Sequence, residues 1–213
     1  MAKQSVSSTS VLWLCAIVLL SACSGRPTES AAPTEAEAPA PTQTAAPAPT
    51  STTLPTQTSA PDAPFELAST AFAEGEVIPA RVACTGEDLS PELTWGTPPE
   101  GTVTLALLFD DPDGFNWVHW LIYNIPADAG GLPEGMPDDP ELPDGSLQGQ
   151  TSWGTVGYRG PCPPVGTPHT YVFTLYALDT ALALEAGAEV NAFQLTIDGH
   201  VLAEIEYTGE FTR

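Results

Sequence analysis

The residues best suited to chemistry lie in two short segments, each beside an apolar run. In the first, Asp111 closely follows an apolar run that ends at Phe109, and His119 comes eight residues later. In the second, a loop rich in Pro and Gly leads into His169 and Tyr171, which would project from the same face of a strand. Imidazoles and a phenol can donate hydrogen bonds to phosphate oxygens, while a carboxylate orients a ring or accepts from an ammonium group. These residue types indicate an anion site or acid–base chemistry.

The same segments also allow purely structural interpretations. A buried histidine needs a polar partner, so either ring could be a core histidine that a neighbour satisfies. Asp113 lies in an Asp-Pro-Asp-Gly turn, where such side chains bond their own backbone, and we do not count it as a ligand contact. His200 precedes Glu204 by four residues on a predicted helix, a spacing that suits a surface pair. We interpret Asp113 and His200 as structural.

The elements that must position these residues are mainly strands. Residues 102–109, 118–125 and 171–178 have a period of two, are apolar on both faces, and are rich in aromatic and β-branched residues. In the second of these strands, simple alternation places His119 on the same face as Leu121 and Tyr123. Turn-rich segments between the strands predict a mostly β fold, an antiparallel β-sandwich of two sheets.

A short C-terminal helix and a long loop complete the predicted domain. Asn191 can cap the helix, and Phe193, Ile197 and Val201 repeat every four residues, so we expect this helix to pack on an edge of the sandwich. Residues 132–145 are rich in proline and acidic side chains and predict a long loop.

The charge balance excludes one large functional class. The chain has 213 residues, with 27 acidic and five basic side chains and a net charge of −22. Unassisted binding to nucleic-acid phosphates is therefore not expected. Residues 65–213 hold 23 of the acidic and three of the basic side chains, so the predicted folded domain carries a charge of −20.

The N-terminal segment resembles a lipoprotein signal. Ten apolar residues, 11–20, are too few to cross a bilayer, and the following Leu-Ser-Ala-Cys run resembles the bacterial lipobox. We predict a lipoprotein signal peptide over residues 1–22, acylation of Cys23, and a disordered Pro/Ala/Thr-rich tether over residues 23–64. The alternative is a cleaved secretory peptide with an incidental cysteine. The expected location is extracytoplasmic, as a membrane-anchored lipoprotein of the bacterial cell envelope.

Two cysteines remain in the predicted folded domain. Cys84 and Cys162 are enough for one disulfide, and an oxidising extracytoplasmic compartment favours its formation. The alternative is a pair of free buried thiols that behave as small apolar side chains.

Four separated motifs together resemble one known family. They occur in order over nearly the whole folded domain, as residues 84–95, Asp111-Pro-Asp113, residues 117–124, and residues 157–164 with Pro168-His169. In this arrangement they resemble the phosphatidylethanolamine-binding protein family, and most closely its bacterial, Raf kinase inhibitor-like branch. Gly114-Phe115 departs from the pattern, because the family usually has Ala-Pro there, so that Phe115 replaces a pocket proline.

The resemblance implies a sandwich of two β-sheets with a small anion pocket at one end, and neither a metal nor a cofactor. Carried over by motif, the ligand-binding residues would be Asp111, His119, Gly160, Pro161, Cys162, Pro164, His169 and Tyr171. The implied ligand is phosphate or a phosphorylethanolamine-like group.

Two classes of function follow. The first is a tethered binding protein, not an enzyme: either a receptor for a small anionic or phosphorylated ligand, or a modulator that docks on an unidentified protein partner through the same pocket. The second is an enzyme in which Asp111, His119 and His169 hold a metal or perform acid–base work on a phosphoester. No serine elbow, phosphate loop or paired zinc motif accompanies that set. A weaker alternative is an inhibitor of a secreted enzyme. Metal content and phosphoester turnover separate the first two classes.

Overall fold

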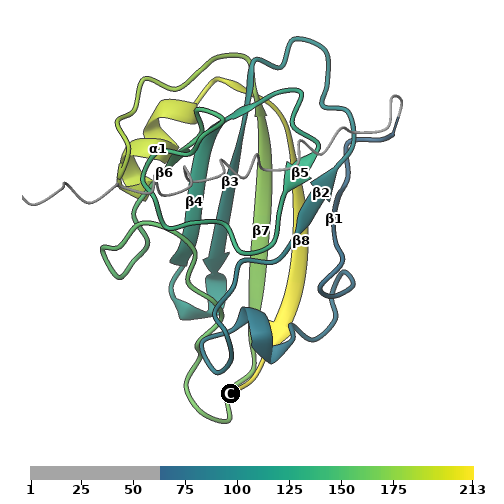
Figure 1. Ribbon diagram of the computed structural model, residues 1–213, viewed down its shortest axis with the longest axis vertical. Helices are drawn as coiled ribbons and strands as arrows, with labels where there is room; N and C mark the ends of the chain where they lie inside the picture. The colour runs from purple at the N-terminus through teal and green to yellow at the C-terminus, as the bar shows by residue number, and fades with distance from the viewer. Residues whose placement is uncertain (1–62) are drawn as a thin grey trace, which may run out of the picture. The chain divides into compact units, whose positions relative to one another are not determined.

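The computed structural model describes residues 63–213, and Figure 1 shows how they are arranged. Within this part of the chain, a smaller sheet with the strand order β1-β2-β5 packs against a larger sheet with the order β6-β4-β3-β7-β8. Neighbouring strands in both sheets are antiparallel. The strands are β1 Leu67–Ser69, β2 Leu93–Trp95, β3 Thr104–Asp111, β4 Trp117–Pro126, β5 Gly131–Leu132, β6 Leu147–Gln148, β7 His169–Leu178 and β8 Val201–Phe211. Two short 3-10 helices, η1 Ala80–Val82 and η2 Pro112–Gly114, and one α-helix, α1 Val190–Ile197, lie between them.

The predicted fold class, a mostly β antiparallel sandwich with a short C-terminal helix, is confirmed. Strand β3 runs two residues further than the period-two pattern predicts and includes Asp111, while β7 begins two residues earlier, at His169. Both polar residues are therefore held by paired strands and not by loops. The predicted boundaries of the signal peptide and the tether lie almost entirely outside the described residues and stay predictions.

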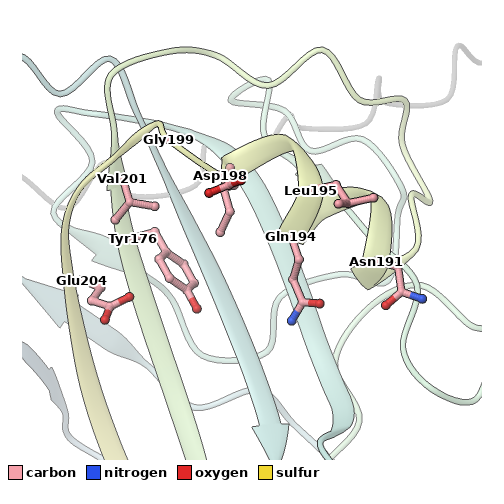
Figure 2. Close-up of a pocket in the computed structure, with 9 residues that line it drawn as sticks. Tyr176, Asn191, Gln194, Leu195, Asp198, Gly199, Val201 and Glu204 are labelled. Atoms are coloured by element: carbon pink, nitrogen blue, oxygen red, sulfur yellow. The ribbon is translucent and has the colours of Figure 1, made fainter.

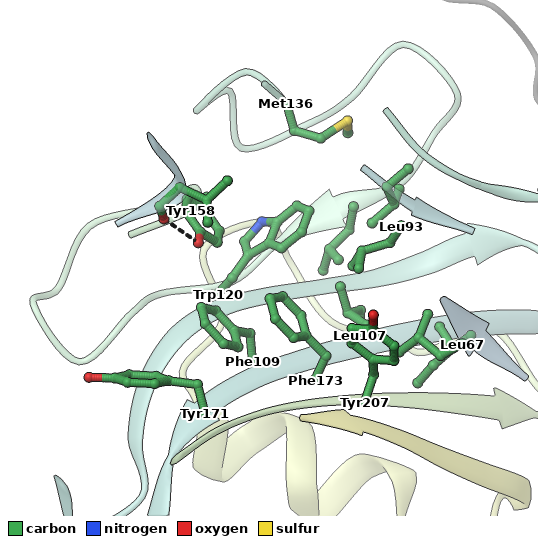
Figure 3. Packing of buried hydrophobic residues seen from close by; sticks show 14 of the residues in the cluster. Leu67, Leu93, Leu107, Phe109, Trp120, Met136, Tyr158, Tyr171, Phe173 and Tyr207 are labelled. Atoms are coloured by element: carbon green, nitrogen blue, oxygen red, sulfur yellow. Dashed lines mark hydrogen bonds between the residues drawn. The ribbon is translucent and has the colours of Figure 1, made fainter. Parts of the chain in front are cut away.

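Aromatic side chains fill the space between the two sheets. Phe109 and Phe173 face each other across the β3–β7 register, and their ring centroids are 3.8 Å apart in a stacked arrangement (Figure 3). Tyr158 also stacks on Phe109, with a centroid distance of 5.7 Å. A second apolar cluster, including Leu121, covers the opposite face of the larger sheet beneath α1. Because both faces of this sheet are buried, its central strands are apolar on both sides.

The C-terminal helix differs from its prediction at both ends. It begins after Glu189, which lies at the N-cap without a side-chain capping bond, so Asn191 does not cap it. It ends at Ile197, and Gly199 then takes a positive φ of 80° that reverses the chain into β8. Val201 accordingly begins a strand and does not continue the apolar face of the helix. A glycine tolerates this left-handed turn without steric cost, which is why the chain turns there.

Candidate functional site

Asp111 and His169 form the polar centre of the site at one end of the larger sheet. The Asp111 Oδ1 atom accepts a hydrogen bond from the Gly114 amide at 2.8 Å, which caps η2. Its Oδ2 atom lies 2.7 Å from Nδ1 of His169. A carboxylate only accepts, so Nδ1 of His169 carries the hydrogen and its Nε2 atom is left to face a ligand. Asp111 is buried and therefore holds the imidazole in one orientation.

His119 reaches the same centre because strand β4 carries a bulge. Phe109 pairs with Trp120 and the next residue, Asp110, pairs with Val118, so His119 is the extra residue of β4. A bulge re-aims a side chain, and the His119 ring contacts Phe109 and Tyr171, with centroid distances of 5.3 and 5.2 Å. The prediction that His119 shares a face with Leu121 and Tyr123 is wrong, because it assumed regular alternation.

A main-chain carbonyl fixes the tautomer of His119. Its Nδ1 atom lies 2.7 Å from the carbonyl oxygen of Arg159, so Nδ1 carries the hydrogen and Nε2 of the neutral ring is an acceptor. Burial lowers the pKa of this imidazole below 6.5, although the hydrogen bond to Arg159 and the charge of Asp111 act in the opposite direction. His119 is therefore neutral at neutral pH.

Tyr171 places an unpaired donor in the site. The residue is buried, and its hydroxyl has no hydrogen-bond partner among the described residues, although Asp111 and the main chain of Cys162 are near it. Burial, and after it the charge of Asp111, raises the pKa of this phenol, so the hydroxyl keeps its hydrogen. Figure 3 shows the hydroxyl pointing away from the aromatic core. A buried donor without an acceptor is costly, and a ligand oxygen would satisfy it.

The loop over residues 160–164 is tied to the segment 82–88 by several contacts. Cys84 and Cys162 form a disulfide with a Cα–Cα distance of 5.5 Å, and the Cys84 amide donates to the Pro161 carbonyl at 3.2 Å. The Gly160 amide donates to Oδ1 of Asp88 at 2.7 Å. A Cβ atom at Gly160 would lie 2.2 Å from the carbonyl oxygen of Val82, so only glycine fits. Pro161 is buried in this loop, whereas Pro164 is exposed.

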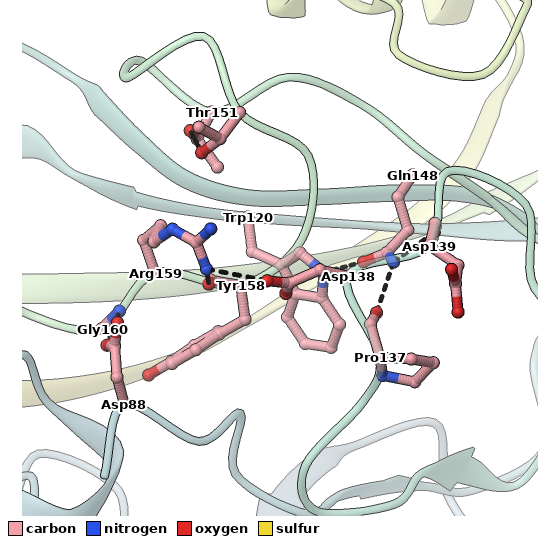
Figure 4. A network of polar contacts seen from close by, with 11 residues as sticks. Asp88, Trp120, Pro137, Asp138, Asp139, Gln148, Thr151, Tyr158, Arg159 and Gly160 are labelled. Carbon is pink, nitrogen blue, oxygen red and sulfur yellow. Dashed lines mark hydrogen bonds and ion pairs between the residues drawn. The ribbon is translucent and has the colours of Figure 1, made fainter.

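Arg159 and Asp88 are site-supporting residues that the sequence analysis missed (Figure 4). The Arg159 carbonyl orients His119, and the Arg159 guanidinium pairs with Asp138 at 3.1 Å. Asp88 holds the loop of residues 160–164 in place by accepting the hydrogen bond from the Gly160 amide. Arg159 lies within the motif of residues 157–164, but it orients His119 through its main-chain carbonyl, which the type of its side chain does not reveal.

Two tryptophans border the polar centre. The Trp153 ring lies edge-on to His119 with a centroid distance of 5.0 Å, and Trp117 meets Trp153 edge-on at 5.4 Å. Both are partly exposed. They form an aromatic border beside His119.

Three sequence-based interpretations need correction. Asp113 does not bond its own turn; its Oδ2 atom accepts from the Thr170 amide at 2.8 Å, and Asp111 performs the turn-capping role. Phe115 does not replace a pocket proline in packing, because its side chain is 98% exposed. His200 lies after α1, and its Nδ1 atom pairs with Asp179 at 2.8 Å, so the predicted pairing with Glu204 along a helix is wrong.

A separate cavity of about 830 Å³ lies between α1 and strands β7 and β8 (Figure 2). Tyr176, Gln194 and Glu204 are among the residues that line it, and none of the predicted site residues does. Figure 1 places α1 at the end of the larger sheet opposite to η2 and the C-terminus. The cavity and the polar centre are therefore distinct places in the fold.

Residues 63–213 lack two kinds of feature. No group of three or more His, Cys, Asp or Glu side chains there has an arrangement that could hold a metal ion. In the same range, no helix is both long and apolar enough to cross a bilayer.

The sandwich, the Asp111–His169 pair and the motif order all agree with one family, and comparison with known proteins identifies it. The family model described as phosphatidylethanolamine-binding protein matches residues 68–212. The chain belongs to this family. A UPF0098 protein of Methanothermobacter thermautotrophicus is 49% identical over 149 residues, which cover 69% of this chain and 98% of that protein.

Other relatives extend the comparison. The crystal structure of Escherichia coli YbcL, described as a new member of the mammalian PEBP family, matches with a TM-score of 0.66 and 32% identity, covering 71% of this chain and 99% of that one. LppC of Mycobacterium tuberculosis, whose name describes a lipoprotein, is 43% identical over 128 residues, or 59% of this chain and 61% of that protein.

Proposed function

We propose that this protein binds a small anionic group, such as phosphate or the phosphate of a phosphorylethanolamine-like molecule, between Asp111, His119, His169 and Tyr171. The buried hydroxyl of Tyr171 carries the proposal, because it is a donor that keeps its hydrogen and, although the Asp111 carboxylate is near it, makes no hydrogen bond of normal geometry among the described residues. A ligand oxygen placed there would remove the cost of that unpaired group. Membership of a family named for binding phosphatidylethanolamine supports the same ligand class.

The protonation states favour a singly protonated phosphate. His119 is neutral and presents Nε2 as an acceptor, so a P–OH group can donate to it while a P–O⁻ oxygen accepts from Tyr171. His169 has its Nδ1 hydrogen held by Asp111, and protonation of Nε2 would turn that atom into a second donor toward the ligand. The site therefore offers both a donor and an acceptor to one oxyanion.

Long-range electrostatic attraction does not assist the binding of an anion to this protein. Residues 65–213 carry a charge of −20, which opposes the approach of any anion. The three arginines of this range are already engaged: Arg81 pairs with Glu134, Arg159 pairs with Asp138, and Arg213 donates to the Cys162 sulfur. Short-range hydrogen bonds in the site must therefore supply the affinity.

Calorimetric titration with inorganic phosphate and with phosphorylethanolamine tests the proposal. Tyr171→Phe removes only the unpaired hydroxyl, so we expect about tenfold weaker binding together with an unchanged or more stable unliganded fold. Tyr176→Phe is the matched control, because Tyr176 lies on the same strand and faces the separate cavity. Failure of the parent protein to bind either compound, or equal losses in both variants, would contradict the proposal.

We propose binding without catalysis. The Asp111–His169 pair could serve acid–base chemistry, since Asp111 would orient the ring during proton transfer. Turnover of a generic phosphoester that His169→Ala abolishes would establish the enzyme alternative. The role as an inhibitor of a secreted enzyme and the protein partner stay predictions.

We also propose that the chain is a membrane-tethered lipoprotein. The lipobox-like run at Cys23 and the similarity to LppC support this, and Cys23 itself lies outside the described residues. Changing Cys23 to Ala should abolish acylation of the protein and release it from the membrane fraction. Metabolic labelling with a radioactive fatty acid would detect the first change, and fractionation would detect the second. Equal labelling of parent and variant would refute the acylation.

A further inference from the structure

We propose that Phe115, Trp117 and Trp153, which we call the aromatic rim, insert into the surface of a zwitterionic phospholipid bilayer. This inference goes beyond the ligand proposed above and concerns how the domain meets a membrane. It depends on the proposed tether only for keeping the domain near that membrane.

The exposure of these three rings is the first observation. Phe115 is 98% exposed, and Trp117 and Trp153 are 40% and 46% exposed. Trp117 and Trp153 contact each other edge-on with centroids 5.4 Å apart, and Phe115 comes two residues before Trp117 in the chain. Aromatic side chains, tryptophan above all, concentrate where membrane and water meet.

The backbone beneath Phe115 is the second observation. Phe115 and Asn116 have φ values of 63° and 55°, in the left-handed region that bulky residues avoid. The Phe115 ring gains no packing within the domain that would offset this conformation. Strained backbone of this kind clusters at functional sites, such as those that hold a ligand.

The rim and the polar centre share one end of the sandwich. Phe115 follows η2, which Asp111 caps, and Trp153 contacts the His119 ring directly. Figure 1 shows this turn at the end of β3, away from α1. An apolar patch beside donors for an oxyanion matches a phospholipid surface, where phosphate groups lie next to acyl chains.

Charge and chain length select a zwitterionic bilayer as the occupant. Residues 65–213 carry −20, so an anionic lipid surface repels the domain, whereas a neutral one does not. Residue 63 lies 40 positions after Cys23, which is enough chain for a domain anchored at Cys23 to turn its rim toward the membrane. Such tethering gives a high effective concentration of the bilayer at the rim.

Quenching of tryptophan fluorescence by brominated phosphatidylcholine tests the inference. The full chain, purified as it occurs in the cell, is incubated with phosphatidylcholine vesicles that contain the brominated lipid. We expect quenching in the parent protein. In Phe115→Ser the equilibrium constant for insertion into the vesicles should fall roughly tenfold or more, because one phenyl ring no longer enters the apolar layer. Phe115→Gly should show the same loss while folding at least as well, since glycine accepts the backbone conformation of this turn.

Leu195→Ser is the matched control, because Leu195 is 80% exposed on α1 at the other end of the domain, and it should leave quenching unchanged. Anionic phosphatidylglycerol in the vesicles should reduce quenching, and added salt should restore it. Absence of quenching in the parent, which a rim that binds a protein would produce, overturns the inference, as do equal effects of Phe115→Ser and Leu195→Ser.

Phosphate titration of the same samples distinguishes this inference from the proposed ligand. Rim-dependent quenching without phosphate binding would refute only the ligand proposal, and phosphate binding without quenching would refute only this one.

Discussion

His119 donates its Nδ1 hydrogen to the main-chain carbonyl of Arg159 across 2.7 Å, and this contact decides what the ring can offer to a ligand. The hydrogen bond holds one tautomer, and burial lowers the pKa of the imidazole. At neutral pH the ring therefore presents an acceptor, and it becomes a second donor only after protonation.

Affinity for a permanently dianionic probe should consequently rise as the pH falls below 6.5. Sulfate stays dianionic over this range, so a change in its binding reports the protein, and an imidazolium at His119 would donate to it and add positive charge. Calorimetry between pH 4.5 and 8 should show most of the gain below 6.5, because the pKa of His119 is lowered. A His119→Gln variant should flatten the profile; an unchanged profile would assign the effect to another group.

The same lowered pKa has a consequence for stability. Below pH 6.5 the unfolded chain binds a proton at His119 more readily than the folded protein does, so the free energy of unfolding should fall as the pH decreases through this range. Denaturant unfolding of parent and His119→Gln at several pH values measures it, and the variant should lose less stability on acidification.

His169→Ala should weaken phosphate binding by about 1.5 to 3 kcal/mol, the range for a hydrogen bond to a charged group. His200→Ala is a matched control, because His200 also pairs with an aspartate at 2.8 Å, but lies at the exposed turn before β8. Titration calorimetry of the parent and of both variants compares their affinities for phosphate. Equal losses in both variants would remove the anion site from this end of the sheet.

Asp110 should destabilise the fold at neutral pH. Burial, then the charges of Asp111 and Glu206, raises the pKa of Asp110 from 3.8 to about 6. The folded protein therefore holds a proton that the unfolded chain releases, and the stability from this group is present below pH 3.8 and lost as the pH rises through 6. Asp110→Asn should stabilise the protein at pH 8 by less than about 1 kcal/mol after solvent screening, and should not stabilise it at pH 4. Thermal unfolding at the two pH values gives the comparison.

Removal of the Cys84–Cys162 bridge should cost on the order of 4 kcal/mol, because it closes a long loop, with a sequence separation of 78 residues, and restricts the unfolded chain. Denaturant unfolding of the parent with and without reductant, alongside a Cys84→Ser/Cys162→Ser variant, measures the loss. The oxidised parent should show no free thiol from this pair after denaturation, and two labelled thiols would contradict the bridge.

Local sequence determined much of this protein. Alternation of apolar residues predicts the three long central strands, because a strand buried on both faces leaves that pattern wherever it lies. The spacing of His169 and Tyr171 places both rings on one face of β7, where their centroids lie 6.4 Å apart. The separated motifs predict the family, since each is tied to a local backbone shape or a side-chain type.

Only the tertiary structure decided the remaining features, and each depends on a contact between distant segments. The bulge that turns His119 toward Tyr171 appears only in the pairing of β4 with β3. The Arg159 carbonyl selects the tautomer of His119 from forty residues away in the sequence, and a main-chain group has no residue type by which to predict it. Likewise, the exposure of Phe115 follows from the left-handed turn after η2, and pairing of His200 with Asp179 follows from where α1 ends. Periodicity reports which residues are apolar, whereas register, tautomer and exposure are set by the partner that each group meets after folding.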